Sequence, residues 1–322
     1  MSLPPNALRY LPYIPLLFSP FLFYVQPRGI ASPALDPGLG SIPSNSRARE
    51  VYSEDWVEGG AYVQLPLGRV RYWLVGPKSG KKITMIHGLS IPALCYAKLV
   101  PRLVDAGYQV LLYDLYGRGY SDAPQGIPYD AKLYVTQLAL LLQHVKWEST
   151  RLVGFSMGGS IVAAFIATFP ALVDREVVLI SCAGARETPF PRNRWAPVLQ
   201  LLRRILPTPK PDPSESTLDE IARLQGTNLP GFAHAVASSL QDGPPTRMRW
   251  AFQAPAWAGK RVVFIHGTCD EFFPPEHASL LMSLVVAAGG GAKVVYIQDG
   301  GHDLVWDNAE EVGRALLPFL DA

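Results

Sequence analysis

The sequence predicts an α/β protein in which helices cover both faces of a mostly parallel β-sheet. Short apolar, β-branched runs alternate with longer helical patterns along the chain. Such alternation requires crossover connections, and these make neighbouring strands parallel. A glycine-flanked serine, Ser156, also stands between one strand-like run and one helical run. At 322 residues the chain is long enough for one large α/β domain that carries an insertion.

The expected sheet has eight strands. Tyr62–Leu65 and Val70–Val75 predict an opening antiparallel hairpin that turns at Leu67 and Gly68. The later strand-like runs cover 83–86, 109–113, 150–155, 176–181, 261–266 and 293–297. The helical patterns lie near 92–106, 131–145, 158–168, 275–288 and 307–319.

Ser156 is the expected nucleophile. It lies in Gly154-Phe-Ser-Met-Gly158, after an apolar strand-like run and before a helical run that ends at Pro170. Strand, G-x-S-x-G and helix together form a nucleophile elbow, a strained turn that lifts a serine hydroxyl above the edge of a sheet. A tight turn of this kind needs neighbours without bulky side chains, which the glycines provide.

Asp270 and His302 are the expected partners of this serine. Asp270 follows the strand-like run 261–266, and His302 follows the run 293–297, so both lie on loops at strand C-termini. A serine at its ordinary pKa needs an adjacent base, and a carboxylate must orient that base. The chain order Ser, Asp, His is the order that a nucleophile elbow of this kind requires.

The amides of Leu89 and Met157 are the expected oxyanion hole. One donor should come from the residue after the nucleophile, and the other from the loop after an earlier strand. Residues 82–86 form that strand in the prediction, and Gly88 permits the turn that would aim the Leu89 amide. His87 is interpreted as a residue that shapes this loop through local hydrogen bonds, because the role of base is already filled.

The motifs together resemble those of α/β-hydrolase-fold serine hydrolases. They are His87–Ser90, Asp114–Asp122, Gly154–Gly159, His266–Asp270 and Gly301–His302, and the resemblance covers roughly residues 55–320. Within the fold they are most similar to the branch of monoacylglycerol lipases, other carboxylesterases and C–C bond hydrolases. The resemblance implies a Ser/Asp/His triad and no cofactor.

Two departures narrow this resemblance. C–C hydrolases usually carry more glycine after the His-Gly pair than Leu89-Ser90 offers, which counts against that activity. Epoxide hydrolases and dehalogenases of this fold use an aspartate nucleophile, which Ser156 excludes. In the segment Asp114–Asp122, the glycines and Arg118 are interpreted as shaping and bracing a loop.

Residues 185–258 interrupt the alternation and predict a helical lid insertion. The segment is proline-rich, with helical stretches expected near 194–205, 215–224 and 230–241. Its aromatic side chains could roof an apolar pocket or form the insertion's own small core. They are Phe190, Trp195, Phe232, Trp250, Phe252 and Trp257.

Four segments are therefore expected. They are an apolar arm and linker over 1–50, a core over 51–184, the insertion over 185–258 and the rest of the core over 259–322.

The N-terminal arm contains the strongly apolar run Leu11–Val25, which is short for a membrane span and is interrupted by prolines. It is compatible with a signal peptide, a membrane-embedded arm or a segment packed on the protein. Membrane association is favoured over packing, and a membrane-associated or secretory location over a cytoplasmic one. The Pro-, Gly- and Ser-rich residues 33–50 predict a linker.

Composition excludes several classes of function. The net charge is +2, from 29 basic and 27 acidic residues, which gives no electrostatic case for nucleic acid. Cys95, Cys182 and Cys269 are widely spaced and predict neither a metal site nor a disulfide framework. No cofactor and no metal are expected.

The expected activity is hydrolysis of carboxylic esters, with lipid or other apolar acyl groups as the substrate class. A C–C bond or lactone hydrolase would use the same triad, and a hydrolase-fold binding protein would hold a ligand with little turnover. Turnover of short p-nitrophenyl esters separates these alternatives.

Overall fold

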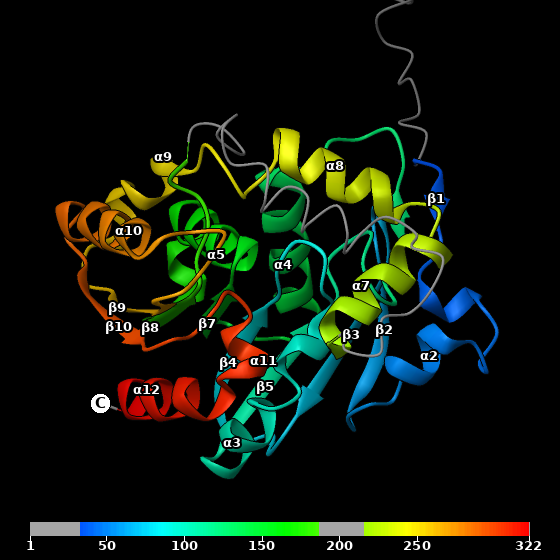
Figure 1. The fold of residues 1–322 in the computed structure, drawn as a ribbon, viewed down its shortest axis with the longest axis horizontal. Helices are drawn as coiled ribbons and strands as arrows, with labels where there is room; N and C mark the ends of the chain where they lie inside the picture. The colour runs from blue at the N-terminus through cyan, green and yellow to red at the C-terminus, as the bar shows by residue number, and fades with distance from the viewer. Residues whose placement is uncertain (1–32, 187–215, 322) are drawn as a thin grey trace, which may run out of the picture. The chain divides into compact units, whose positions relative to one another are not determined.

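An eight-stranded sheet forms the centre of the protein (Figure 1). The computed structural model describes residues 33–186 and 216–321, and the chain divides into a unit Met1–Pro33 and a unit Ala34–Ala322. The sheet belongs to the second unit and has the strand order β10-β9-β8-β7-β4-β5-β3-β2. Its strands are β2 (Gly60–Leu65), β3 (Gly68–Val75), β4 (Lys81–Ile86), β5 (Tyr108–Tyr113), β7 (Thr150–Phe155), β8 (Val173–Ile180), β9 (Arg261–Gly267) and β10 (Gly291–Ile297).

The sheet is mostly parallel, as the sequence predicts. Strand β3 pairs antiparallel with both β2 and β5, and all other neighbouring strands run parallel. The α-helices among the described residues are α2 (Arg47–Val51), α3 (Val100–Asp105), α4 (Ala131–His144), α5 (Met157–Thr168), α7 (Thr217–Asn228), α8 (Phe232–Asp242), α9 (Arg249–Phe252), α10 (Pro275–Ala287), α11 (Leu304–Asp307) and α12 (Ala309–Asp321). Short 3₁₀ turns are η2 (Leu39–Ser41), η3 (Ala93–Tyr96), η4 (Pro170–Leu172) and η5 (Pro255–Trp257).

Both faces of the sheet are buried, because successive side chains on a strand point to opposite faces. Leu152 and Phe264 join the cluster that contains the apolar side chains of α4, α5 and α10. Their strand neighbours Val153 and Val263 join a second cluster with α3, α11 and α12. The two groups of helices lie on opposite sides of the sheet in Figure 1. This burial explains why the inner strands read as continuous apolar runs.

Two expected helices differ in detail from the structure. The pattern over 92–106 is divided into η3 and α3, and Pro101 stands in the first turn of α3. Proline has no backbone N–H and its ring clashes with a preceding helical turn, so a continuous helix cannot pass through that position. The C-terminal pattern is divided into α11 and α12.

The insertion contributes α7 and α8, which agree with the helices expected near 215–224 and 230–241. The helix expected near 194–205 lies outside the described residues. Helix α7 lies beside α2, and Arg47 on α2 forms an ion pair with Glu220 on α7, at 2.8 Å between Nε and Oε1 (Figure 1).

The linker expected over 33–50 is wrong from Ala34 onward, where the chain belongs to the second unit. Strand β1 (Leu35–Asp36) pairs antiparallel with β6 (Ala123–Pro124). Leu39 is completely buried, and its N–H donates to the carbonyl of Gly119 at 2.9 Å. Composition misled the prediction because proline and glycine favour ordered extended segments and turns as much as flexible linkers.

The apolar run Leu11–Val25 lies outside the described residues. Among the described helices, none combines the length and the apolar character that crossing a bilayer would require.

The boundary at Ala34 predicts how the protein tolerates truncation. A chain that begins at Pro33 keeps β1 and the buried Leu39, so it should unfold at the temperature of the full chain. A chain that begins at Arg47 loses both and should be less stable by at least about 2–5 kcal/mol, the range for deleting a buried leucine side chain. Thermal and urea unfolding of the two chains test this, and equal stability would contradict the assignment of residues 34–46 to the domain.

Candidate active site

Ser156 lies in the sharp turn between β7 and α5. Its backbone has φ 53° and ψ −118°, a conformation that a residue with a side chain rarely adopts. The flanking glycines allow this turn through close approach. A Cβ on Gly154 would lie 2.6 Å from the Gly158 carbonyl oxygen, and one on Gly158 would collide with the carbonyl of Ile86 at the end of β4. The turn is therefore pressed directly against the neighbouring strand.

The structure brings Ser156, His302 and Asp270 into one hydrogen-bonded chain. His302 Nε2 lies 2.9 Å from Ser156 Oγ, and His302 Nδ1 lies 2.9 Å from Asp270 Oδ2. All three side chains are buried. Because an ionised carboxylate only accepts, Nδ1–H donates to Asp270 and Nε2 is left to accept from the serine hydroxyl. This is the arrangement that a serine nucleophile with a histidine base requires.

Asp270 is held in the orientation that faces His302. Its Oδ1 accepts hydrogen bonds from the backbone N–H groups of Phe272 and Phe273, each at 2.9 Å. Burial alone would raise the pKa of the Asp270 carboxyl. The adjacent His302 and the Phe273 N–H outweigh burial and hold that pKa below its ordinary value. The carboxylate is therefore ionised at neutral pH.

Aromatic rings surround the imidazole. The ring centroids of Phe155, Phe272 and Phe273 lie 5.4, 4.8 and 5.6 Å from that of His302. His266 holds Phe273 in turn, since its Nε2 lies 2.8 Å from the Phe273 carbonyl oxygen, to which it donates. Sequence reasoning did not identify Phe272 and Phe273 as neighbours of His302. The phenylalanines stand two and three positions after Asp270, where an Asx-type turn would place N–H donors.

Leu89 and Met157 both line the pocket of Ser156. Gly88 is needed for a close approach, since a Cβ there would lie 3.3 Å from Ser156 Cβ. Gly88 does not have the positive φ of a left-handed turn, so the turn-forming role expected for it is wrong. Its lack of a side chain instead leaves room for Ser156.

His87 shapes this loop, as the sequence analysis indicates. Its Nε2 accepts from the Leu115 N–H at 2.9 Å, so the other ring nitrogen, Nδ1, carries the proton and donates to the Gly88 carbonyl, also at 2.9 Å. Complete burial lowers the pKa of His87 to about 3, which keeps the ring neutral.

The pocket at Ser156 is small and mostly apolar, with a volume of about 60 Å³. It is lined by Gly88, Leu89, Ser90, Ile91, Phe155, Ser156, Met157, Ala183, Leu240, Pro245, Phe272, Phe273, His302 and Asp303. Of the insertion, Leu240 and Pro245 therefore reach the pocket. Of the two roles open to the insertion's aromatic residues, roofing the pocket is not seen: Phe232, Phe252 and Trp257 are buried without lining it, and Trp250 is 52% exposed. Phe190 and Trp195 lie outside the described residues.

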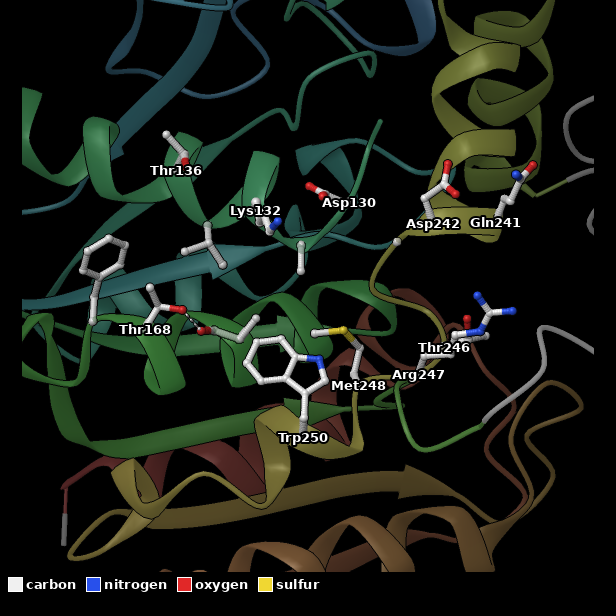
Figure 2. Close-up of a pocket in the computed structure, with 15 residues that line it drawn as sticks. Asp130, Lys132, Thr136, Thr168, Gln241, Asp242, Thr246, Arg247, Met248 and Trp250 are labelled. Carbon is white, nitrogen blue, oxygen red and sulfur yellow. Dashed lines mark hydrogen bonds between the residues drawn. The ribbon is translucent and has the colours of Figure 1, made fainter. Parts of the chain in front are cut away.

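A second cavity, of about 560 Å³, is larger (Figure 2). Some of its lining residues are adjacent in sequence to Leu240 and Pro245, which line the pocket at Ser156. The start of α4, the end of α5, residues 241–243, residues 246–248 and Trp250 line it. Figure 2 shows Met248 and Trp250 on one side and Thr136 and Thr168 on another. Ser156, Asp270 and His302 do not line this cavity, and Ser156 and His302 line the smaller pocket.

Comparison with known proteins agrees with this geometry. The profile of the alpha/beta hydrolase family matches residues 85–315. The chain belongs to this family. The 2-hydroxy-6-oxo-2,4-heptadienoate hydrolase of Pseudomonas putida is 28% identical over 223 residues, which are 64% of this chain and 78% of that protein.

Two solved structures are similar in fold. A carboxylesterase structure from Nitrososphaera gargenis has a TM-score of 0.64 at 18% identity and covers 81% of this chain and 98% of its own. A bacterial membrane phospholipase A has a TM-score of 0.66 at 19% identity and covers 98% of this chain and 94% of its own. The structure therefore has the α/β-hydrolase fold, with an eight-stranded, mostly parallel sheet flanked by helices.

His277 on α10 predicts part of the response to acid. Its ring stacks on Phe273, and its Nε2 has no hydrogen-bond partner in the described part of the chain. Burial, helped by the charge of Arg186, lowers its pKa from 6.5 to about 4. Between these values the unfolded chain binds a proton that the folded chain does not, so this residue's contribution to stability is lost as the pH falls from 6.5 towards 4.

The change His277→Phe keeps the ring stack and removes this titration. We expect the difference in unfolding free energy between pH 7.5 and pH 5 to shrink by about 2 kcal/mol in urea denaturation. An unaltered pH dependence in His277→Phe would contradict the assignment.

Proposed function

We propose that this protein hydrolyses carboxylic esters through an acyl-enzyme intermediate on Ser156. The observation that carries the proposal is the continuous chain of two 2.9 Å hydrogen bonds from Ser156 through His302 to Asp270. Its setting adds support, because Ser156 lines an apolar pocket that Leu89 and Met157, the residues expected to supply the oxyanion hole, also line.

In the first half-reaction, Ser156 Oγ attacks the ester carbonyl carbon and His302 Nε2 takes the hydroxyl proton. The carbonyl oxygen becomes an oxyanion, to which the N–H groups of Leu89 and Met157 donate. The C–O bond to the alcohol then breaks, and His302 gives its proton to the leaving oxygen. Asp270 keeps the imidazole in the needed tautomer and stabilises its charged form.

In the second half-reaction, water attacks the acyl carbon and His302 takes a proton from that water. The bond to Ser156 Oγ breaks, the serine oxygen regains the proton from His302, and the carboxylic acid leaves. No group beyond these side chains and water is needed for the balance of atoms and protons.

The pocket supports an apolar group next to the ester. Leu89, Ile91, Leu240, Phe272 and Phe273 present hydrocarbon surface around the serine. Burying such surface is favourable by about 25 cal/mol per Å², so an acyl group gains more there than a polar one would. We propose lipid or other apolar acyl esters as the substrate class, with the insertion over 185–258 acting as a lid.

A C–C bond hydrolase is the second candidate, favoured by the likeness to the Pseudomonas putida enzyme. It would use the same three side chains. That relative is a 2-hydroxy-6-oxo-2,4-heptadienoate hydrolase, so this keto acid belongs in the substrate panel beside short and long p-nitrophenyl esters.

The decisive variant is Ser156→Ala. Loss of the nucleophile should lower kcat for p-nitrophenyl butyrate by about a million-fold and abolish labelling by a fluorophosphonate probe. Ser160→Ala is the matched control, because Ser160 is a buried serine on the same helix that does not line the pocket, and it should keep its activity. If Ser156→Ala keeps a tenth of the wild-type rate, Ser156 is not the nucleophile and the proposal is wrong. Turnover of the keto acid without ester turnover would favour the second candidate, and labelling without either would favour a binding protein.

We also propose that the Leu11–Val25 run binds membrane surfaces. Each large apolar side chain gains about 1.5–3 kcal/mol on leaving water, so several together can hold a protein on a bilayer. The full chain should cosediment with phosphatidylcholine vesicles, and a chain that begins at Pro33 should not, while both hydrolyse a short soluble ester at the same rate. Equal vesicle binding by the two chains would contradict this role.

A further inference from the structure

The loop that follows β4 is held by its own His87 and by side chains from two other parts of the fold. This loop contains Leu89, whose N–H is a proposed oxyanion donor, and it has no helix or strand of its own before η3. A backbone amide can stabilise a developing charge only if its peptide plane is fixed in advance. The hydrogen bonds to the carbonyl groups of this loop fix its peptide planes.

Three consecutive carbonyl groups of the loop each accept a hydrogen bond from a side chain. His87 Nδ1–H donates to the Gly88 carbonyl at 2.9 Å. Arg118 Nε donates to the Leu89 carbonyl at 2.9 Å, and Gln225 Nε2 to the Ser90 carbonyl at 3.0 Å. The Leu89 N–H belongs to the same peptide as the Gly88 carbonyl and points opposite to it, because the described peptide bonds are trans. Fixing these carbonyls fixes the direction of that N–H.

Arg118 is itself completely buried and rigidly held. Its remaining nitrogens donate to the Tyr116 carbonyl at 3.0 Å, to the Tyr134 hydroxyl at 2.8 Å and to Ser239 Oγ at 3.0 Å. No acidic side chain forms an ion pair with it among residues 33–186 and 216–321. The guanidinium group thus serves as a planar fork between backbone and hydroxyl oxygens, a task that lysine cannot reproduce.

Gln225 joins the insertion to the same loop. It is fully buried on α7, and its Oε1 accepts from the Gly119 N–H at 2.7 Å while its Nε2 donates to Ser90. Gly119 follows Arg118 directly, and Ser239, which holds Arg118, lies on α8. Helices α7 and α8 of the insertion therefore contribute to one network with the loop of Leu89.

We propose that Arg118 and Gln225 are positioning residues for the oxyanion hole, which they serve together with His87. By this account α7 and α8 form a fixed clamp on the Leu89 loop, and the insertion is required for the chemical step as well as for covering the pocket. The inference rests on the proposed function, since it concerns the oxyanion of that reaction.

The test compares Arg118→Lys, Gln225→Glu and Gln225→Met with the control Gln137→Met. Gln137 is a buried glutamine that bridges the Asp114 carbonyl and the Tyr116 N–H, so its loss removes two hydrogen bonds of the same kind without touching the three carbonyls. Fluorophosphonate titration gives the concentration of active sites in each preparation. Steady-state kinetics on p-nitrophenyl butyrate then give kcat per site and KM, and thermal unfolding gives Tm.

A displaced donor should weaken the transition state and leave substrate binding intact. We expect kcat per site to fall about 10- to 100-fold in the Arg118 and Gln225 variants, with KM within about threefold of the wild type. The affinity for butylboronic acid, which forms an anionic tetrahedral adduct on the serine, should fall by a similar factor. Gln137→Met should lose a comparable amount of Tm and keep its kcat.

Three results would overturn the inference: kcat per site within threefold of the wild type in these variants, an unchanged boronic acid affinity, or an equal loss of kcat in Gln137→Met. If Arg118→Lys does not fold, the two Gln225 variants decide by the same criteria. A wild-type protein that neither hydrolyses esters nor reacts with the fluorophosphonate would instead overturn the proposed function, and it is measured first.

Discussion

The contact between the ends of β4 and β7 is the constraint on which the site depends. The two strands are neighbours in the sheet, and the turn after β7 approaches β4 so closely that Gly158 has no room for a side chain against the Ile86 carbonyl. This contact sets Ser156 beside the loop that follows β4, and a Cβ at Gly88 would already touch the serine. Leu89 follows β4 and Met157 follows β7, so this contact between the two strand ends brings both proposed oxyanion donors to the pocket. A larger residue at Gly158 would separate them.

Charge in the site is controlled by burial and by backbone donors. Asp270 is buried, yet its pKa is held low because His302 and the Phe273 N–H stabilise the carboxylate. Asp114, at the end of β5, shows the opposite balance. Complete burial raises its pKa to about 6, although the N–H groups of Ala93 and Tyr120 donate to it. The difference follows from the partner, since only Asp270 has an imidazole in direct hydrogen-bond contact.

The sheet and the relative places of Ser156, Asp270 and His302 could be predicted from the sequence, because the reasoning needs only local periodicity and one rule of topology. Parallel strands end at the same edge, so residues that follow β7, β9 and β10 must lie near one another. The partners of Gln225 could not be predicted in this way. A glutamine inside a helix carries no signal of which distant carbonyl it will bind, and nothing in the sequence distinguishes it from a solvent-exposed one. Residues 34–46 were misjudged for a related reason, since their order depends on the pocket that accepts Leu39.

Arg118 and Gln225 are buried polar groups that bond largely to peptide groups, and this determines what they do. An ion pair between two side chains has many acceptable geometries, whereas a hydrogen bond to a carbonyl restricts the orientation of a whole peptide plane. Arg118 donates to peptide oxygens and hydroxyls, and Gln225 bridges an N–H and a carbonyl. Taking a guanidinium out of water is itself expensive, so the hydrogen bonds of Arg118 largely offset the cost of its burial. The network therefore contributes orientation more than stability, and it lies where the proposed chemistry needs an amide held in one direction.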